Sequence, residues 1–213
     1  MSKLWIVCLA ILFLAGTVVL AEDIQPPDWR GEWSTTSQVW EFSTLQSNPI
    51  KPDGPALGGN PPLLSTQLTV TPGPSMGWID KDPSGRQGIW PLSGMMDVIV
   101  DNHNPPNEFK WVWVQITWRP QDPGKHPIIE PMIEEGYQTT PPVLVERFEF
   151  IGTDWFEDTY FWQIQPNPPD ERFTITGIID VDELVIDTWC IPEPATLGLL
   201  LVGGVLALSR RVR

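Results

Sequence analysis

The hydrophobic pattern of the chain has three parts: an apolar N-terminal stretch, a long middle part and an apolar C-terminal stretch. In the middle part, apolar residues recur at every second position, which is typical of β-strands with one buried face. No proline-free stretch there shows the i, i+3, i+4 apolar spacing over three helical turns. Pro-Pro pairs, which lack N–H donors and fix the chain as extended or turning, separate the alternating segments. The pattern therefore predicts an all-β protein.

Nine short strands with Pro- and Gly-containing turns favour an antiparallel β-sandwich, of jelly-roll type. Residues 48–62 are rich in Pro and Gly and are expected to form a long surface loop. The alternation predicts strands at residues 38–43, 64–70, 88–92, 95–101, 109–119, 143–151, 155–165, 173–179 and 183–189.

The segment FKWVWVQITW, residues 109–118, shows the clearest alternation. Its even-numbered apolar residues from Val112 to Trp118 are expected in the core, and its odd-numbered aromatics on the opposite face. The chain has 12 tryptophans, and exposed aromatic rings can stack on sugars while polar neighbours bind the hydroxyls. The alternative is that both faces are buried. The candidate sugar-binding residues are Trp111, Trp113, Gln115, Tyr160 and Trp162.

The N-terminus has the form of a secretory signal peptide. Lys3 supplies a positive charge, residues 4–20 are almost wholly apolar, and Ala21 ends a small-residue cleavage site. We expect residues 1–21 to be removed on export, with an uncleaved anchor as the alternative. Residues 22–189 then form the exported domain.

The C-terminal segment CIPEPATLGLLLVGGVLALSRRVR covers residues 190–213. Its fourteen apolar or small residues, 195–208, would span about 21 Å as a helix at about 1.5 Å per residue, less than the ~30 Å hydrocarbon core. This length suits a transient anchor better than a permanent one. The terminal arginines would remain cytoplasmic, and a plain membrane anchor is the alternative.

The Pro-Glu-Pro motif, the apolar run and the arginine cluster, in that order, resemble the PEP-CTERM sorting signal of Gram-negative bacteria. The resemblance implies recognition by an exosortase, a membrane cysteine enzyme that removes the tail during transfer to the cell surface. It also implies an association with exopolysaccharide and biofilm matrix. Recognition would involve Pro192, Glu193 and Pro194, and arrest of transfer would involve Arg210, Arg211 and Arg213.

Three further stretches, PPDWRGEWSTTSQVWEF, GIWPLSG and DELVIDTWCIPEP, are similar to parts of small exported proteins that carry the same tail. The ectodomains of those proteins are uncharacterised. The resemblance therefore implies a shared surface-protein architecture without naming an activity.

Charge and cysteine content narrow the possible classes of protein further. The chain has 27 acidic and 13 basic residues, of which one acid and four bases lie in the terminal segments. The middle part therefore has 26 acids and 9 bases, a net charge of about −17, which repels nucleic-acid phosphates. Cys8 lies in the signal peptide and Cys190 beside the tail, so no disulfide is expected within the domain.

Enzyme motifs are scarce: the chain has no HExxH zinc motif, and the predicted domain at residues 22–189 has no cysteine that could serve as a nucleophile. We therefore expect a non-catalytic protein without a cofactor. A glycan-processing enzyme with two carboxylates remains the alternative, using Glu146 with Glu149 or Glu157 with Asp158. A further expectation is Ca²⁺ binding by loop oxygens, with candidate ligands Asp97, Asp101, Asn102, Asn104, Asp180, Asp182 and Glu183.

These observations together predict an exported, acidic, all-β protein of the cell surface or extracellular matrix. It is expected to bind or associate structurally with exopolysaccharide. The alternatives are a carbohydrate-binding module that uses exposed tryptophans and a glycan-processing enzyme. The expected partners are an exosortase-type membrane enzyme and an extracellular polysaccharide, with membrane contact through the tail and no nucleic acid.

Overall fold

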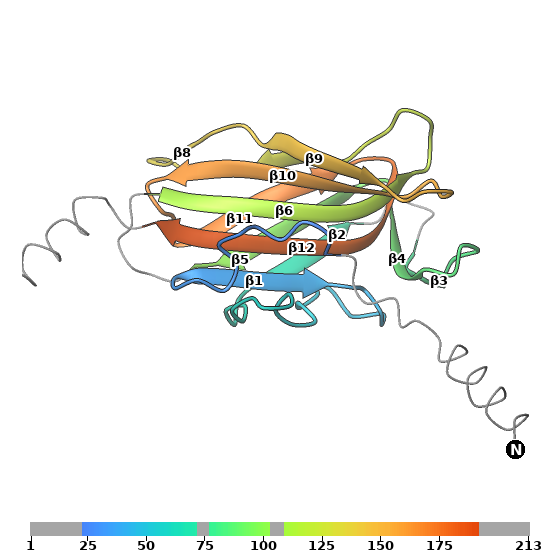
Figure 1. Ribbon diagram of the computed structural model, residues 1–213, viewed down its shortest axis with the longest axis horizontal. Coiled ribbons are helices and arrows are strands. Elements are labelled where there is room, and N and C mark those ends of the chain that lie inside the picture. The colour runs from blue at the N-terminus through green and yellow to red at the C-terminus, as the bar shows by residue number, and fades with distance from the viewer. Residues whose placement is uncertain (1–22, 72–76, 103–108, 192–213) are drawn as a thin grey trace, which may run out of the picture.

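A computed structural model describes residues 23–71, 77–102 and 109–191. The predicted signal peptide and the Pro-Glu-Pro, apolar and arginine parts of the predicted tail lie outside the described residues. Within them, twelve β-strands form two antiparallel sheets, and the larger sheet lies in front of the smaller one in Figure 1. The all-β prediction is confirmed. No helix in the described part of the chain is long and apolar enough to span a membrane.

The larger sheet has eight strands, in the order β3-β4-β12-β6-β10-β8, with β1 also paired to β12 and β9 also paired to β10. Its two longest strands, β6 and β12, lie side by side in the middle of the sheet (Figure 1). The strands are β1 (Thr35–Trp40), β3 (Ile79–Lys81), β4 (Gln87–Leu92), β6 (Phe109–Pro120), β8 (Gln138–Thr139), β9 (Val143–Glu149), β10 (Phe156–Gln165) and β12 (Ile179–Ile191).

The smaller sheet has the order β2-β5-β11-β7, with β2 (Gln67–Thr71), β5 (Met95–Asp101), β11 (Asp170–Thr176) and β7 (Ile128–Pro131). Burial alternates along β5 with the period of two that the sequence predicts. The inner faces of both sheets contribute to one hydrophobic core. Its members include Leu68, Val70, Met96, Val98, Phe173 and Ile175 from the smaller sheet, and Val112, Val114, Ile116, Trp118, Trp162 and Ile186 from the larger.

All nine predicted strands correspond to observed strands: the strand predicted at 95–101 coincides with β5, and the ends of the others shift by at most four residues. Sequence reasoning missed β3, β7 and β8, which have three, four and two residues and are too short to show alternation. The last strand, β12, continues to Ile191, so the sheet extends two residues beyond the predicted domain end at 189.

The predicted surface loop at residues 48–62 packs more closely than expected. Ile50 forms an isolated bridge with Leu68, and Gly54 forms one with Val39. Ile50 and Ala56 are both buried. The loop therefore packs against β1 of the larger sheet and β2 of the smaller sheet, and it does not extend freely into solvent.

Candidate functional site

The register of β6 and β10 divides the predicted sugar-binding residues between two faces. Trp113 lies opposite Phe161, and Val112 lies opposite Trp162. Residues opposite one another in an antiparallel pair share a face, so Trp162 and Tyr160 join Val112 in the core, where they are 1% and 8% exposed. The candidates on the outer face of the larger sheet are Trp111, Trp113 and Gln115. The five predicted residues therefore do not form one platform.

Five aromatic rings form a continuous row on the outer face of the larger sheet, which we call the outer aromatic row. The ring centroids of Trp29 and Trp189 are 5.7 Å apart and the rings are stacked. Trp189 contacts Trp111 edge-to-face at 5.5 Å. Trp111 contacts Phe161 at 5.6 Å, and Phe161 contacts Trp113 at 6.2 Å. All five side chains are half-buried, so the row retains surface for a ligand.

The N-terminal segment, residues 23–34, is hydrogen-bonded to the same face. The Trp113 Nε1–H donates to the Gln25 carbonyl oxygen at 3.1 Å. The Gln25 N–H donates to Gln115 Oε1 at 2.9 Å, and Gln115 Nε2 donates to Asp23 Oδ1 at 2.8 Å. Gln115 is therefore buried and occupied by this segment, which removes it from the surface that a sugar would reach.

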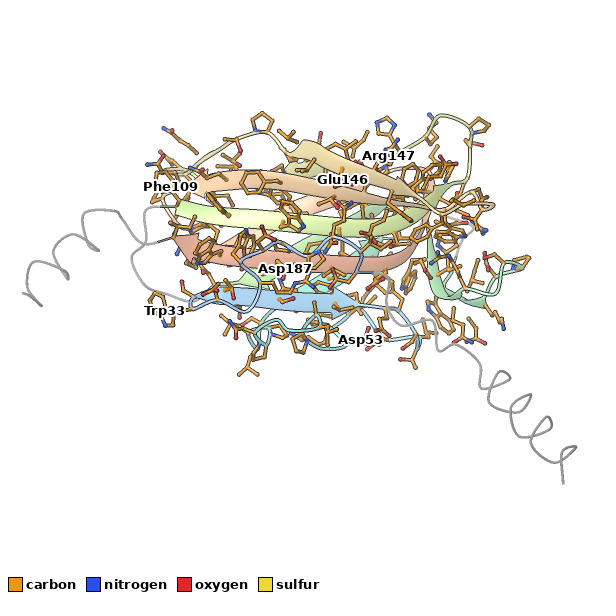
Figure 2. The ribbon with its side chains drawn as sticks, in the orientation of Figure 1. Trp33, Asp53, Phe109, Glu146, Arg147 and Asp187 are labelled. Carbon is orange, nitrogen blue, oxygen red and sulfur yellow. The ribbon has the colours of Figure 1, made fainter. Side chains whose placement is uncertain are left out.

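Arg30 fastens this segment to the sheet through two carboxylates. Its guanidinium donates to Asp187 at 2.8 Å (Nε to Oδ1) and 2.5 Å (Nη2 to Oδ2), and it also pairs with Asp23. Asp187 is fully buried beneath the segment (Figure 2). Burial raises the pKa of Asp187 although the neighbouring guanidinium opposes the shift. The ion pair therefore holds Trp29 of the outer aromatic row against β12.

A further tryptophan is exposed at one end of the molecule. Trp33 is 73% exposed, and it lies at the same end as Phe109 (Figure 2). The next residue, Ser34, donates its hydroxyl to the Cys190 carbonyl oxygen at 2.8 Å, which fixes this turn against the end of β12. Sequence reasoning did not identify Trp29, Trp33, Phe161 or Trp189 as candidate binding residues. The sequence shows that they are aromatic, but it does not show that Trp29, Phe161 and Trp189 share a face, because that depends on strand register.

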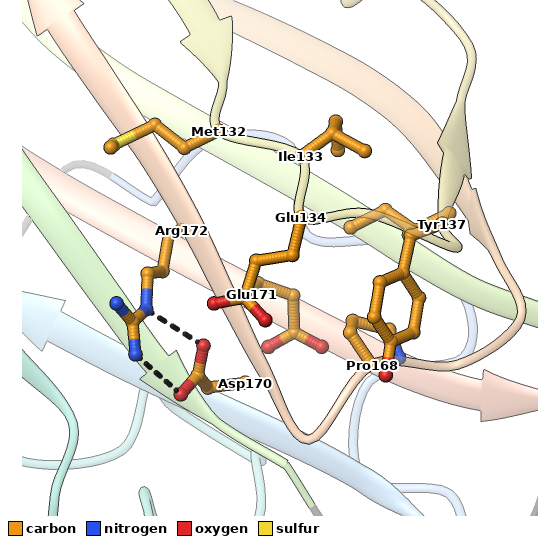
Figure 3. A pocket seen from close by; sticks show the side chains of 9 residues that line it. Met132, Ile133, Glu134, Tyr137, Pro168, Asp170, Glu171 and Arg172 are labelled. Atoms are coloured by element: carbon orange, nitrogen blue, oxygen red, sulfur yellow. Dashed lines mark hydrogen bonds and ion pairs between the residues drawn. The ribbon is translucent and has the colours of Figure 1, made fainter.

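A small pocket lies beside the start of β11 (Figure 3). The loop after β7 contributes Met132, Ile133 and Glu134 to its lining. At its rim, the Arg172 guanidinium donates to Asp170 Oδ1 at 2.9 Å. The pocket lies apart from the outer aromatic row.

The carboxylates considered for glycan hydrolysis are dispersed. Glu146 and Glu149 are exposed on β9, whereas Glu157 and Asp158 are buried on β10. Asp158 accepts hydrogen bonds from the Arg147 guanidinium at 2.6 and 2.7 Å. Adjacent strand residues point to opposite faces, so Glu157 and Asp158 do not face one site.

Several of the candidate Ca²⁺ ligands likewise accept hydrogen bonds or form ion pairs within the protein. Asp101 Oδ2 accepts from the Ser65 N–H at 2.8 Å. Asp180 pairs with Arg119 at 2.7 Å, and Asp182 pairs with Arg86. Asp97 and Asp101 lie on β5, Asp180, Asp182 and Glu183 lie on β12, and Asn104 lies outside the described residues. The described ranges contain no group of three or more His, Cys, Asp or Glu side chains that could hold a metal ion.

One polar cluster between the sheets was not anticipated. Lys110 and Cys190 are directly paired in the register of β6 and β12, and both are fully buried beside Glu171 and Asn102, which are also buried. The sequence carried a signal for this cluster, because Lys110 has the same parity as Val112 and so points toward the core.

No family model, no curated protein and no solved structure matches this chain. The fold and the surface define this chain as an all-β protein of two antiparallel sheets. The outer face of the larger sheet carries the half-buried outer aromatic row.

Proposed function

We propose that this chain is an exported protein of the cell surface or extracellular matrix that binds polysaccharide through the outer aromatic row. The observation that carries the proposal is the continuous series of five rings joined by four contacts, from Trp29 to Trp113, on a half-buried surface. Aromatic faces stack on the apolar faces of sugar rings, and polar neighbours bind the hydroxyls. Gln163, opposite Trp111 on β10, is such a neighbour.

The terminal segments support this location. A signal peptide at residues 1–21 would export the chain, and the resemblance of residues 190–213 to a PEP-CTERM tail would make it an exosortase substrate. Membrane contact would then be transient, and the mature protein would reside with the exopolysaccharide of the surface or biofilm matrix. We further propose that the two sheets form a β-sandwich of jelly-roll type.

Binding without catalysis is favoured by the state of the acidic residues. Asp158 and Asp187 are both buried in ion pairs with arginine. Both carboxylates already accept hydrogen bonds from a guanidinium within the fold, so neither is free to act on a substrate.

Co-sedimentation of the purified full chain with the exopolysaccharide of the producing organism tests the proposal, with tryptophan emission followed in parallel. We expect saturable binding that Trp111→Ala and Trp189→Ala each weaken by about fivefold or more, since central aromatic contacts are worth more than about 1 kcal/mol.

The matched control is Phe148→Ala, which removes an aromatic ring that is 39% exposed on β9, away from the outer aromatic row. This variant should bind as the unmodified protein does. Absence of binding at saturating polysaccharide would refute the proposal, as would full binding by a folded Trp111→Ala variant.

A further inference from the structure

Four polar side chains meet between the sheets, near the start of β6 and the end of β12. Lys110 and Cys190 come from these two strands of the larger sheet. Asn102 directly follows β5, and Glu171 lies on β11 of the smaller sheet. Lys110 and Cys190 are 0% exposed, Glu171 is 1% exposed and Asn102 is 8% exposed. The cluster therefore joins the two sheets in an environment that excludes water.

The distances place an amine directly against a carboxamide. Lys110 Nζ donates to Asn102 Oδ1 at 2.7 Å and lies 2.8 Å from Glu171 Oε1. Because a C=O bond is about 1.2 Å long, Nζ is at most about 4 Å from the Asn102 Cγ atom. This separation is close to the roughly 3–3.5 Å of a near-attack arrangement.

The other contacts orient the amide for attack. Asn102 Nδ2 donates to Asn167 Oδ1 and to the Pro168 carbonyl oxygen, so its nitrogen points away from Lys110. The Cys190 thiol donates to Asn102 Oδ1 at 2.8 Å. The thiol is therefore placed to stabilise the carbonyl oxygen, where negative charge develops when Nζ adds to Cγ.

The environment also favours a protonated Glu171 carboxyl. Burial of a lysine–glutamate pair away from water is costly for both charges. Burial raises the pKa of Glu171, and the neighbouring Lys110 only partly opposes that shift. Transfer of the Nζ proton to the carboxylate yields a neutral amine beside a carboxylic acid, which is the reactive state of a lysine nucleophile.

We propose that Lys110 and Asn102 form an intramolecular isopeptide bond, with Glu171 as the proton shuttle. Nζ attacks Cγ and the Nζ–Cγ bond forms. A proton from Nζ passes through the Glu171 carboxyl to Nδ2, the Cγ–Nδ2 bond breaks, and ammonia leaves. The step needs no oxidant, reductant or co-reactant. Glu171 also lines the pocket in Figure 3, so the surface on this side of the cluster is the side toward which ammonia would leave.

The bond would change both the charge and the connectivity of the core. The lysine ammonium becomes a neutral amide, so Glu171 remains protonated without a buried counter-ion. The end of β5 in the smaller sheet becomes covalently joined to β6 in the larger one. Such a link constrains the unfolded chain as a disulfide does, in a domain whose described cysteine, Cys190, forms no disulfide.

Peptide mapping of the denatured full chain tests the proposal, using trypsin together with a glutamate-specific protease. Glu108 lies between Asn102 and Lys110 in the sequence, so cleavage after it separates them unless they are bonded. Fragments 87–108 and 109–125 should remain joined, with a mass lower than their sum by about 17 Da, the mass of ammonia. Cyclisation within one fragment also loses ammonia but does not join two fragments.

Glu171→Gln preserves the size of the side chain and removes the proton shuttle. We expect this variant to release fragment 111–125, because trypsin can cut after an unmodified Lys110. Glu130→Gln on β7 is exposed and should remain joined. Joined fragments in a folded Glu171→Gln variant would overturn the role of Glu171. Release of fragment 111–125 from the unmodified protein would overturn the isopeptide bond itself, whether or not any variant folds.

Discussion

Replacement of Arg30 by Met should destabilise the protein strongly. The change removes the guanidinium that contacts Asp187 and Asp23 while keeping a side chain of similar length. Asp187 is fully buried, and the Arg30 side chain is only 5% exposed. The variant would leave a buried carboxylate without its cation, and the N-terminal segment would lose its charged attachment to β12.

Removal of one partner from a buried ion pair costs about 3–5 kcal/mol. With a urea dependence of about 2 kcal/mol per molar, the unfolding midpoint should fall by about 1.5–2.5 M. The double variant Arg30→Met with Asp187→Asn removes the unpaired charge. It should therefore recover much of the loss, leaving a cost of about 1–2 kcal/mol.

Urea unfolding followed by tryptophan emission provides the measurement. Arg172→Met is the matched control, because Arg172 is 43% exposed in its pair with Asp170 and exposed pairs contribute only about 0–1 kcal/mol. The reasoning fails if Arg30→Met costs no more than this control. It also fails if the double variant is as unstable as the sum of the two single changes.

Two further predictions concern a glycine with a positive φ and a buried carboxylate. Gly88→Ala would place a Cβ atom 2.3 Å from the Phe42 carbonyl oxygen at a φ of 77°, whereas Gly152→Ala meets nothing within 4 Å at a φ of 80°. The first should lower the thermal midpoint far more than the second, which costs about 1 kcal/mol of left-handed strain; equal shifts would contradict the predicted clash. The native pKa of Asp82 is lowered because a hydrogen bond from the Ser84 hydroxyl and other favourable contacts outweigh its burial. The ionised form therefore contributes stability above about pH 4 that is lost as pH falls through the native pKa. Asp82→Asn should cost about 1–3 kcal/mol at pH 7, and the cost should shrink toward pH 3 in urea titrations; a pH-independent difference would contradict this.

Most of the strands and of the core residues could be predicted from the sequence. A period of two identifies a strand and divides its residues between two faces, and this period placed Val112, Val114, Ile116 and Trp118 in the core, where all four are buried. The same parity assigned Lys110 to that face. Strands of two to four residues were not predicted, because so few positions cannot display a period.

Only the tertiary structure decided which faces combine. Alternation within β6 and β10 leaves open which residue of one lies opposite which residue of the other, and a one-residue change in register moves every side chain to the other face. The pairing of Trp113 with Phe161 therefore places Tyr160 and Trp162 in the core and builds the outer aromatic row from rings that are far apart in the chain.

The buried polar cluster and the attachment of the N-terminal segment to β12 were likewise decided by the tertiary structure. Lys110 and Glu171 are brought together by the packing of two sheets, and Arg30 contacts Asp187 across 157 positions of sequence. Local pattern determines the period and the parity of each strand because these depend on neighbours along the backbone. Contacts between distant segments depend on strand register and on sheet packing, which no single segment encodes.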